Sequence, residues 1–563
     1  MSVEGSSIAR RSDLDAVRSF AMLLGIALHA AMAYIGGAWM IVDDPAEPLL
    51  GLFVAGVHGF RMPLFFLLSG FFSAMLLQRR GLGGLIEQRG KRVLLPLVIG
   101  CLTVVPVTWL ASSWAVSVNA RGVERGAAVE AGGATDLWRA AATGELERLR
   151  SFAKDAGTLD APDPKMGITA LGWAVIAGRA DAAALLLELG ADPNAANWDG
   201  GRPLHAACFF GRSEIAAMLM AKGGDPAAKN AAGESPVDAL RHDEQTTRFI
   251  ANLLKVPVDF GEVEAGRERV RGVLGGGGGA ASGDAEAPAP RDPRGDEARD
   301  APRGQRSRLQ AGTFFQHLWF LWFLCWLNAG LLGVVFLGRL LPGVRVPGAL
   351  LSMPLCLVWV VPLTVVPQWL MHSGGAVAGF GPATSAGLVP VGSVLGYYAV
   401  FFGFGALAYR VNGPGARLGR WWWAALPAAL VMLPVALMFA YSPGRAAAIV
   451  EDEGARRLVS ALLQALYAWL ATLGVLGLCE SVFARRRGWV RYLSDSAYWQ
   501  YLAHLPLVIC GQALLFDVEM PTFAKFAALI AGCVAVLLVS YHLLVRRTVV
   551  GRLLNGPLKI GDG

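Results

Sequence analysis

The sequence is poor in charge. Asp, Glu, Lys and Arg together make up 17% of the 563 residues, whereas roughly 25% is usual in a soluble chain. Hydrophobic residues make up 54%, and this balance excludes a disordered or fibrous protein. The apolar residues form runs of about 20 at both ends of the chain, while the middle third is polar. Runs of that length predict membrane-spanning helices.

The sequence also lacks paired cysteines. It has seven Cys and no CxxC spacing, so neither a zinc site nor a disulfide framework is supported, and we predict no metal site. The formal net charge of +7 is of the sign that nucleic-acid binding requires. However, the basic residues lie in short clusters at the ends of apolar runs, which is typical of cytoplasmic loops. We therefore expect no nucleic-acid partner.

Ten apolar segments are predicted to cross the lipid bilayer, which makes an all-α, polytopic membrane helix bundle the expected fold. The first segment is not a cleavable signal, because acidic Asp13 and Asp15 precede it and no small-residue cleavage site follows. The ten predicted spans are 14–35, 49–77, 93–115, 313–337, 349–371, 387–409, 421–441, 457–483, 493–515 and 522–545.

The loops predict an orientation. Those after even-numbered spans are basic, as at Arg79 and Arg80, whereas those after odd-numbered spans are acidic or mixed, as at Asp43 and Asp44. By the positive-inside rule both termini lie in the cytoplasm, and we expect a multi-pass protein of the inner (cytoplasmic) membrane. The long polar segment between spans three and four then lies outside the cytoplasm.

That polar segment contains a repeat with a period of 33 residues. Thr169-Ala-Leu-Gly-Trp-Ala174 recurs as Arg202-Pro-Leu-His-Ala-Ala207 and, more weakly, as Ser235-Pro-Val-Asp-Ala-Leu240. A degenerate first copy begins at Leu137. The period and the motif resemble the ankyrin repeat. This resemblance implies an α-solenoid, inserted between helices 3 and 4, that binds an unknown protein partner.

Two further features of the repeat predict local structure. Gly144, Gly178 and Gly211 occupy equivalent positions, where helices are expected to end. His205 stands at the histidine position of the repeat itself, so we interpret it as a turn-stabilising residue rather than a catalytic one.

These features predict four parts of the chain. After the repeats, a stretch rich in Gly, Pro, Ala, Arg and Asp is expected to be a flexible tether without a fold of its own. The four parts are a first membrane part with helices 1–3 (1–116), the ankyrin-repeat domain (117–261), the flexible linker (262–312) and a second membrane part with helices 4–10 (313–563).

Charged and titratable residues inside the spans are the candidate functional residues, because a charge at membrane depth costs at least about 2.5–3.5 kcal/mol. Arg18 and His29 in span one lie eleven residues apart, so they project from one helix face about 16 Å apart along the axis. The alternative is a snorkelling Arg and a hydrogen-bonded core His. In span two, His58 and Arg61 lie on adjacent turns. Arg61 is too deep to snorkel easily and needs a carboxylate, a backbone carbonyl or a substrate anion.

Further candidates lie at other depths. Arg89 and Arg92 come after span two at a spacing that suits bidentate binding of a phosphate, although ordinary positive-inside charge is the favoured explanation for the pair taken by itself. His317 opens span four, and His504 lies around the middle of span nine. Glu480 is the one acidic residue clearly within a span, and it is the best candidate partner for a buried Arg.

Several motifs occur together in order, including Leu14-Asp-Ala-Val-Arg18, Phe65-Phe-Leu-Leu-Ser-Gly-Phe-Phe72 and Tyr498-Trp-Gln-Tyr-Leu-Ala-His504. With these motifs the membrane portion resembles the acyltransferase 3 family. The segments His58-Gly-Phe-Arg-Met-Pro-Leu-Phe-Phe66 and His317-Leu-Trp-Phe-Leu-Trp-Phe323 are similar to its glucan biosynthesis protein C-like branch. The resemblance implies a ten-span enzyme that moves an acyl group, of acetyl or succinyl type, onto an extracytoplasmic glycan.

The resemblance also implies roles for the candidate residues. Acyl-CoA would be a co-substrate from the cytoplasm, with no permanently bound cofactor. Arg89 and Arg92 would hold the CoA phosphates, with Arg18 helping. His29 would be the general base or a transient acyl carrier. The remaining candidates would stabilise the oxyanion, bind the carboxylate of a succinyl group or orient the acceptor, namely Arg61, His58, His317 and His504.

Two alternatives belong to other classes. Ion channels combine ankyrin repeats with membrane spans, but they are expected to carry the repeats in the cytoplasm, and no filter-like sequence occurs here between spans. A non-enzymatic receptor or a degenerate acyltransferase that acts through protein binding is the other alternative. The intact set of His and Arg residues argues against the degenerate enzyme.

Overall fold

The protein is described by a computed structural model. The residues that it describes are 11–35, 39–43, 47–130, 137–152, 159–163, 167–197, 199–230, 233–242, 246–247, 250–251, 254, 256, 258–275, 314–338, 346–372, 380–441, 443–485 and 487–555.

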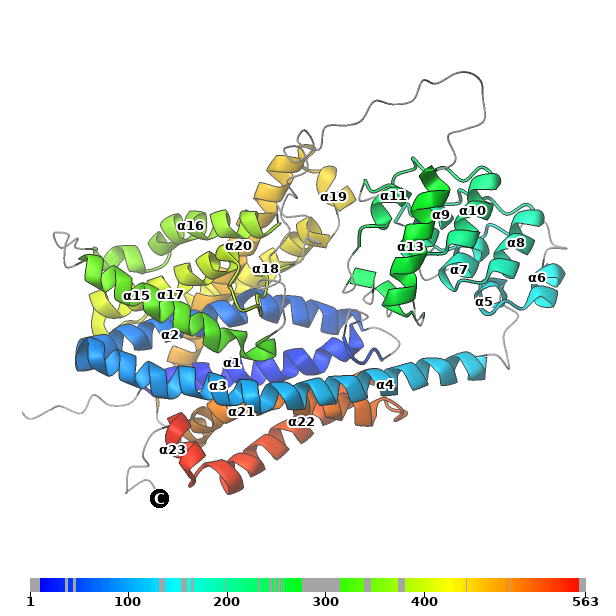
Figure 1. Cartoon of the computed structure of the whole chain (residues 1–563). Coiled ribbons are helices and arrows are strands. Elements are labelled where there is room, and N and C mark those ends of the chain that lie inside the picture. Colours follow the sequence, from blue (N-terminus) through cyan, green and yellow to red (C-terminus); the bar gives the residue numbers. More distant parts are fainter. Residues whose placement is uncertain are drawn as a thin grey trace, which may run out of the picture. The chain divides into compact units, whose positions relative to one another are not determined.

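The chain divides into two compact units. Unit 1 comprises Met1–Gly36, Met40–Ser117 and Arg294–Gly563, and unit 2 comprises Gly37–Trp39 and Val118–Pro293. All regular secondary structure among the described residues is helical (Figure 1). The predicted all-α fold class is thereby confirmed.

Unit 1 is built from long apolar helices and their connections. They are α1 (Ser12–Ala31), η1 (Met32–Tyr34), α2 (Pro48–Arg89), the π-helical turn η2 (Gly90–Leu94), α3 (Leu95–Leu102), α4 (Val104–Glu130, which extends beyond the unit), η3 (Gln316–Leu318), α15 (Trp319–Gly338), η4 (Gly348–Leu351), α16 (Leu355–His372), α17 (Gly392–Asn412), η5 (Gly413–Gly415), α18 (Trp422–Tyr441), α19 (Pro443–Ala447), α20 (Glu453–Val482), α21 (Gly488–Leu515), α22 (Thr522–Ser540), the π-helical turn η6 (Tyr541–Val545) and α23 (Val549–Asn555).

Helices lie at all ten predicted spans, but they do not all have the length and composition of a span. Among the described residues, seven helical segments are long and apolar enough to cross a membrane, and Leu355–Met371 is a shorter apolar helix. Neither α21 nor α4 is among the seven. The count of ten spans therefore stays a prediction.

Gly81 separates the second and third predicted spans. Its backbone has φ 65° and ψ −171°, a conformation that side chains with a Cβ rarely adopt. Figure 1 shows the chain reversing between the first part of α2 and α3. The third predicted span falls on α3 and the start of α4, and α4 continues past its predicted end at residue 115 to Glu130.

Contacts along the helices of unit 1 fix their relative directions. At one end of α1, Asp15 Oδ1 accepts a hydrogen bond from Ser494 Oγ of α21 (2.9 Å). Toward the other end, the carbonyl of His29 accepts one from Gln512 Nε2 of α21 (2.9 Å), so α1 and α21 are parallel. Two contacts likewise make α2 parallel to α17, namely Phe66 with Tyr398 and Phe71 with Tyr409. The helix α16 is antiparallel to α20, because Gln368 contacts Gln464 and Thr364 contacts Trp469. The helix α21 is antiparallel to α22, because Trp499 contacts Ser540 and Gly511 lies beside Leu529.

The helices α2 and α17 approach most closely where each carries a glycine. A Cβ on Gly70 would collide with the backbone carbonyl of Phe402, and one on Gly405 would collide with that of Leu67. Aromatic side chains fill the space around this crossing, and Phe401 stacks on the fully buried Trp469 with ring centroids 4.1 Å apart. The crossing anchors the segment of α2 that carries two of the candidate residues.

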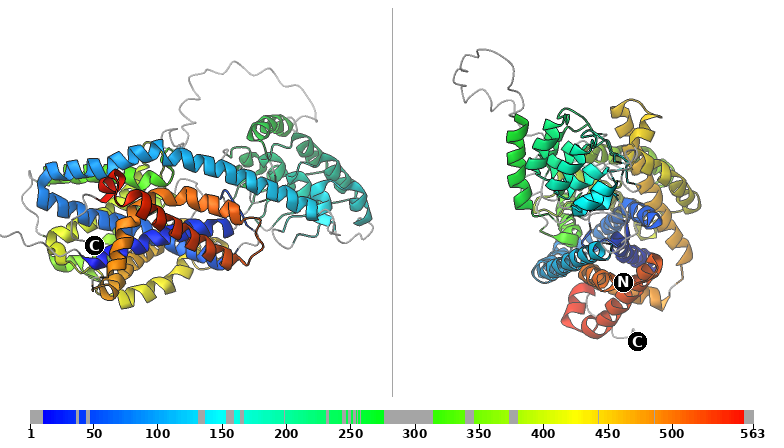
Figure 2. Two further views of the ribbon diagram at one scale, coloured as in Figure 1. Left: turned by 90° about the horizontal axis from the view of Figure 1, so that it is seen from below. Right: turned by 90° about the vertical axis from the view of Figure 1, so that its right-hand side faces the viewer.

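Unit 2 contains the predicted repeats as successive helix pairs (Figures 1 and 2). Gly144, Gly178 and Gly211 lie between the two helices of each pair with φ of 83°, 70° and 65°, which confirms their predicted place at helix ends. The helices are α5 (Leu137–Thr143), α6 (Leu146–Phe152), α7 (Ala170–Ile176), α8 (Ala180–Glu188), α9 (Pro203–Phe209), α10 (Ser213–Ala221) and α11 (Pro236–Ala239).

Side chains at the starts of these helices satisfy backbone groups. Thr169 Oγ1 accepts a hydrogen bond from the N–H of Gly172 (3.2 Å). His205 Nδ1 accepts one from the N–H of Arg202 (3.2 Å), and its Nε2 lies 3.0 Å from the carbonyl of Glu234 in the next repeat. The interpretation of His205 as a turn-stabilising residue is thereby confirmed.

The prediction of an unstructured linker from residue 262 was wrong for residues 262–275. They belong to α13 (Phe260–Gly275), which packs on α9 and α10. Composition suggested a tether, but Val263, Val270 and the partly buried Leu274 contribute apolar surface on this helix, and the side chain of Arg267 is fully buried. The rest of the predicted linker, 276–312, lies outside the described residues.

Candidate functional site

Three histidines from different parts of the chain meet in unit 1. The rings of His29 on α1 and His504 on α21 have centroids 5.3 Å apart, and those of His504 and His317 are also 5.3 Å apart. His317 belongs to η3, directly before α15. His504 is 2% exposed and His317 is 9% exposed, whereas His29 is half-buried. The structure thus brings together three of the predicted histidines as a row with His504 at its centre.

Backbone carbonyls fix the protonated nitrogen of two of these rings. His504 Nδ1 lies 3.0 Å from the carbonyl oxygen of Gln500 and 2.9 Å from that of Tyr501. His317 Nε2 lies 3.1 Å from the carbonyl oxygen of Leu502. Because a carbonyl oxygen can only accept, each of these nitrogens carries the proton of a neutral ring. The opposite nitrogens, His504 Nε2 and His317 Nδ1, are buried and have no hydrogen-bond partner among the described residues.

Pro506 explains why a carbonyl is available to His317. In an uninterrupted helix the carbonyl of residue 502 would accept from the N–H of residue 506. Proline has no N–H, and Pro506 lies inside α21. The carbonyl of Leu502 is thereby left to the imidazole of His317, and the hydroxyl of Tyr501 donates in return to the carbonyl of His317 (2.8 Å).

Arg61 and His58 on α2 lie beside the row of histidines. His29 interacts electrostatically with Arg61, His58, His317 and His504. The guanidinium of Arg61 lies over Gly25 of α1, where a Cβ would collide with its Nη1. Its Nη2 donates to Met62 Sδ (3.7 Å), and its buried Nε has no partner among the described residues.

Arg61 therefore has no carboxylate partner in the part of the chain that the structure describes. Its electrostatic partners are the hydroxyl-bearing rings of Tyr398 and Tyr501. His58 Nε2 donates to the carbonyl of Pro382 (3.1 Å). Of the three partners expected for Arg61, a substrate anion is the one that matches this arrangement best.

A second, basic cluster surrounds Tyr498 on α21. The side chain of Tyr498 interacts electrostatically with Arg18 and Arg89, and its hydroxyl donates to the carbonyl of Arg92 (2.8 Å). Arg89 Nη2 donates to the buried Ser73 Oγ (2.7 Å), while Arg89 Nε is buried without a partner among the described residues. Arg89 ends α2 and Arg92 lies in the π-helical turn η2, so the pair does not sit on a regular α-helical start.

Glu480 pairs with a residue other than those considered from the sequence. Its carboxylate lies 3.3 Å from Arg11 Nη2, and the same guanidinium pairs with Asp13. Arg11 also donates to the carbonyl of Ala416 (2.9 Å). This ion pair holds the start of α1 against the end of α20.

Some residues of the site were not predicted. Tyr501 precedes His504 by three residues, so the spacing of one helical turn could have pointed to it. Gly25, Tyr398 and Gln512 carry no such signal, because each joins the site only through contacts between helices. Among the described residues, no group of three His, Cys, Asp or Glu side chains is arranged to hold a metal ion.

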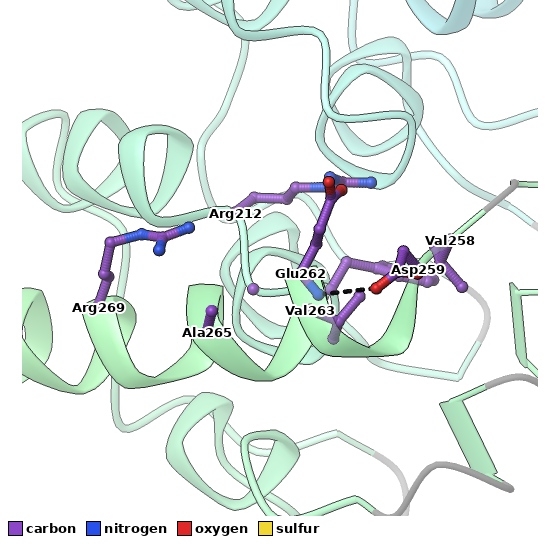
Figure 3. Close-up of a pocket in the computed structure, with 9 residues that line it drawn as sticks. Arg212, Val258, Asp259, Glu262, Val263, Ala265 and Arg269 are labelled. Carbon is purple, nitrogen blue, oxygen red and sulfur yellow. Dashed lines mark hydrogen bonds between the residues drawn. The ribbon is translucent and has the colours of Figure 1, made fainter.

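Unit 2 has a cavity of its own, between α13 and the residues that follow Phe210 (Figure 3). Its volume is about 340 Å³. Figure 3 shows the side chains of Arg212 and Glu262 directed toward each other, with Asp259 and Arg269 on either side. Burial lowers the pKa of Arg212, and the carboxylate of Glu262 counteracts this effect. Two cations and two anions leave this lining formally neutral.

Comparisons with known proteins identify family models for two parts of the chain. A family model described as ankyrin repeats (3 copies) matches residues 137–230. A solved structure of the ankyrin repeat domain of Bcl-3, a member of the IkappaB protein family, is 28% identical. That match covers 21% of this chain and 50% of that chain, with a TM-score of 0.18.

The chain also has curated relatives. Glucans biosynthesis protein C of Escherichia coli (strain SMS-3-5 / SECEC) is 40% identical over 97 residues, and that of Shigella dysenteriae serotype 1 is 37% identical over 97 residues. In both cases the match covers 17% of this chain and 24% of the relative. A model described as an acyltransferase domain matches residues 11–121 and 278–545. This match exceeds half of the chain and includes every candidate residue of both clusters, so the chain belongs to the acyltransferase 3 family.

Proposed function

We propose that the protein is an integral membrane O-acyltransferase. It moves an acyl group, of acetyl or succinyl type, from cytoplasmic acyl-CoA to a hydroxyl of an extracytoplasmic glycan. Membership of the acyltransferase 3 family supports the reaction class, and the similarity to glucans biosynthesis protein C supports a glucan as the acceptor. The observation that carries the proposal is the meeting of His29, His504 and Arg61 within unit 1.

The chemistry follows from the residues of this cluster. His29 removes the proton from the acceptor hydroxyl, and the oxygen attacks the thioester carbonyl. Arg61 stabilises the negative charge that develops on the carbonyl oxygen, or it binds the carboxylate of a succinyl group. His58 gives its Nε2 proton to the carbonyl of Pro382, so the neutral ring has no second donor for the oxyanion. The C–S bond then breaks, and the CoA thiolate leaves with a proton. In the alternative course, His29 carries the acyl group transiently.

The donor is bound at the basic cluster. Arg89 and Arg92 hold the CoA phosphates at the inner surface, and Arg18 lies near the entrance of the pantetheine arm. The unpartnered Nε of Arg89 and its position beside Tyr498 support this role, since guanidinium groups bind phosphate in a bidentate manner. Arg18 and His29 share α1, so this one helix connects the donor end to the reacting end.

The proposed orientation places both termini in the cytoplasm and the ankyrin repeats outside it, where they bind an unknown protein. The basic loops support this orientation. The helix directions support alternate crossings of the bilayer, which require parallel α1 and α21, parallel α2 and α17, and antiparallel α21 and α22.

Transfer from labelled acyl-CoA in membranes tests the reaction. We expect His29→Ala to lower kcat by about 10²-fold or more, the range of general-base catalysis. His542→Gln removes an exposed histidine far along the chain and should transfer at the wild-type rate. Undiminished transfer by His29→Ala would remove His29 from the mechanism. No transfer by wild-type membranes would favour a receptor, a channel or a degenerate enzyme.

A second variant tests the donor site. Arg89→Ala should raise the KM for acyl-CoA with little loss of folded protein, because a surface that binds phosphate loses a charge-assisted contact. Arg547→Ala, at an exposed basic position outside the cluster, serves as the matched control. An equal loss of expressed protein in both variants would indicate that these arginines only set the topology.

A further inference from the structure

We propose that His29, His504 and His317 form one proton-holding chain, in which His504 takes the proton from His29 and shares it with His317. This inference rests on the proposed acyl transfer and assigns roles that the transfer itself does not require. His504 and His317 act through His29, so they are positioning residues rather than groups that touch the substrate.

The fixed tautomers support the chain. With Nδ1–H of His504 directed at two carbonyls, the proton-accepting nitrogen is Nε2, which is buried and uncommitted among the described residues. His317 is held in the opposite tautomer by the carbonyl of Leu502, so its accepting nitrogen is Nδ1. Each ring thus offers one lone pair that the surrounding protein leaves available.

The spacing supports it as well. The centroids of neighbouring rings are 5.3 Å apart on both sides of His504. The accepting nitrogens of His504 and His317 make no direct hydrogen bond among the described residues, so at this separation one bridging water carries the proton between neighbouring rings. The groups that face His504 electrostatically are His29, His317 and Arg61, with the ring of Tyr501 on the same helix.

The proton balance shows what the chain does. When the acceptor O–H bond breaks, its proton moves to His29 and then to His504 and His317. When the C–S bond breaks, the thiolate takes one proton back, and all three rings return to the neutral form. The hydroxyl and the thioester approach from opposite sides of the membrane in the proposed reaction. His29 and His504 both face Arg61, where the proton would place a second positive charge next to the first. The row of rings lets the proton reach His317 between these two events.

The test is a proton inventory of the full-length protein in membranes, with kcat measured in mixtures of water and deuterium oxide. For the wild type we expect a curved dependence on the deuterium fraction, because more than one proton moves. His504→Gln keeps an amide donor for the two carbonyls but cannot accept a proton. We expect its kcat to fall by about 10²-fold, its dependence to become linear and its KM for acyl-CoA to stay unchanged.

His317→Gln provides an independent second variant, since it keeps the hydrogen bond to Leu502 and ends the chain at His504. We expect a smaller loss of kcat and a less curved dependence, while the control His542→Gln should keep the wild-type curve. If either site variant kept both the wild-type kcat and the wild-type curvature, the proposed chain of histidines would be overturned, whereas the transferase function would stand. A wild-type protein without transfer would overturn the proposed function and the chain with it.

Discussion

Arg61 reaches from α2 across to α1, and Gly25 is the residue that makes room for it. The guanidinium occupies the place where the Cβ of any other residue at position 25 would lie. Gly25 also precedes His29 by one helical turn, so both face the same cluster. The absence of a side chain at one position therefore decides where the positive charge of another lies.

Gly25→Ala should reduce activity without unfolding the protein. The colliding atom is the far end of a flexible side chain, so Arg61 can move aside. The displaced charge should cost about tenfold or more in kcat, because small misplacements at a reacting centre are expensive. Gly51→Ala is the control, because Gly51 lies on α2, the helix of Arg61, and no atom lies near its Cβ position. Equal kcat values for the two variants in the labelled-transfer assay would contradict this account.

At the scale of elements, the crossing of α2 and α17 depends on two glycines, Gly70 and Gly405. A Cβ at either position would collide with the backbone of the other helix rather than with a flexible side chain. Gly70 belongs to the motif at 65–72 that resembles the acyltransferase 3 family. The crossing supplies a physical reason for a glycine at that position, because only a residue without a Cβ allows such a close approach of two helices.

Gly405→Ala should lower the stability of the solubilised protein by about 1–3 kcal/mol, the usual cost of overpacking. Gly403→Ala lies on the same helix with nothing near its Cβ position. It should leave the thermal midpoint unchanged or raise it, since Ala is the better helix former. Thermal unfolding of both variants, followed in one detergent, makes the comparison. A Gly405→Ala midpoint at or above that of Gly403→Ala would contradict the close-approach argument.

The helix α13 completes the stack of repeats in unit 2 through one buried cation. Arg267 donates to the carbonyl of Phe209 from both Nε (2.9 Å) and Nη2 (2.6 Å), and Nη1 donates to the carbonyl of His242 (2.6 Å). Its guanidinium also lies over the ring of Phe209, 5.4 Å from the centroid. The terminal repeat is thereby covered by a helix that is not itself a repeat.

Arg267→Met should destabilise unit 2 by about 2–4 kcal/mol, because the buried carbonyls of Phe209 and His242 lose the charge-assisted hydrogen bonds that Arg267 donates. Hydrogen exchange of the full-length protein should then be faster in α9 and α10 and unchanged in α1 and α2. Arg271→Met, at an exposed position of the same helix, is the control. Unchanged exchange in Arg267→Met would mean that α13 contributes little to the stack.

For the whole molecule, the orientation in the membrane is the property that decides which substrate meets which cluster. A membrane-impermeant maleimide added to intact cells should label Lys222→Cys in the repeats but should label Arg79→Cys only after permeabilisation. Both positions are exposed. Burial raises the pKa of the native Cys208 thiol to about 12. This thiol therefore stays protonated below that pH and should remain unlabelled, because the thiolate is the nucleophile. The reverse pattern of labelling would place the repeats in the cytoplasm.

The sequence by itself determined the features that depend on neighbouring residues. Apolar runs located the helices, a 33-residue period located the repeats, and the cost of charge in lipid selected the candidate His and Arg residues. The same local reasoning misjudged residues 262–275, because the fate of a Gly- and Arg-rich stretch depends on whether another surface accepts its few apolar side chains. The apolar pattern predicted that α21 crosses the membrane. Its polar residues make it less apolar than a typical span, and it is not among the seven helical segments that are long and apolar enough to cross.

Only the tertiary structure decided which of the selected residues meet. His317 and His504 are far apart in the chain, and they lie together because Pro506 frees a carbonyl that the imidazole of His317 takes up. Arg61 lies beside His29 because a glycine on another helix leaves the space. Such contacts form between surfaces distant in sequence, and their free energy depends on packing that no single segment contains.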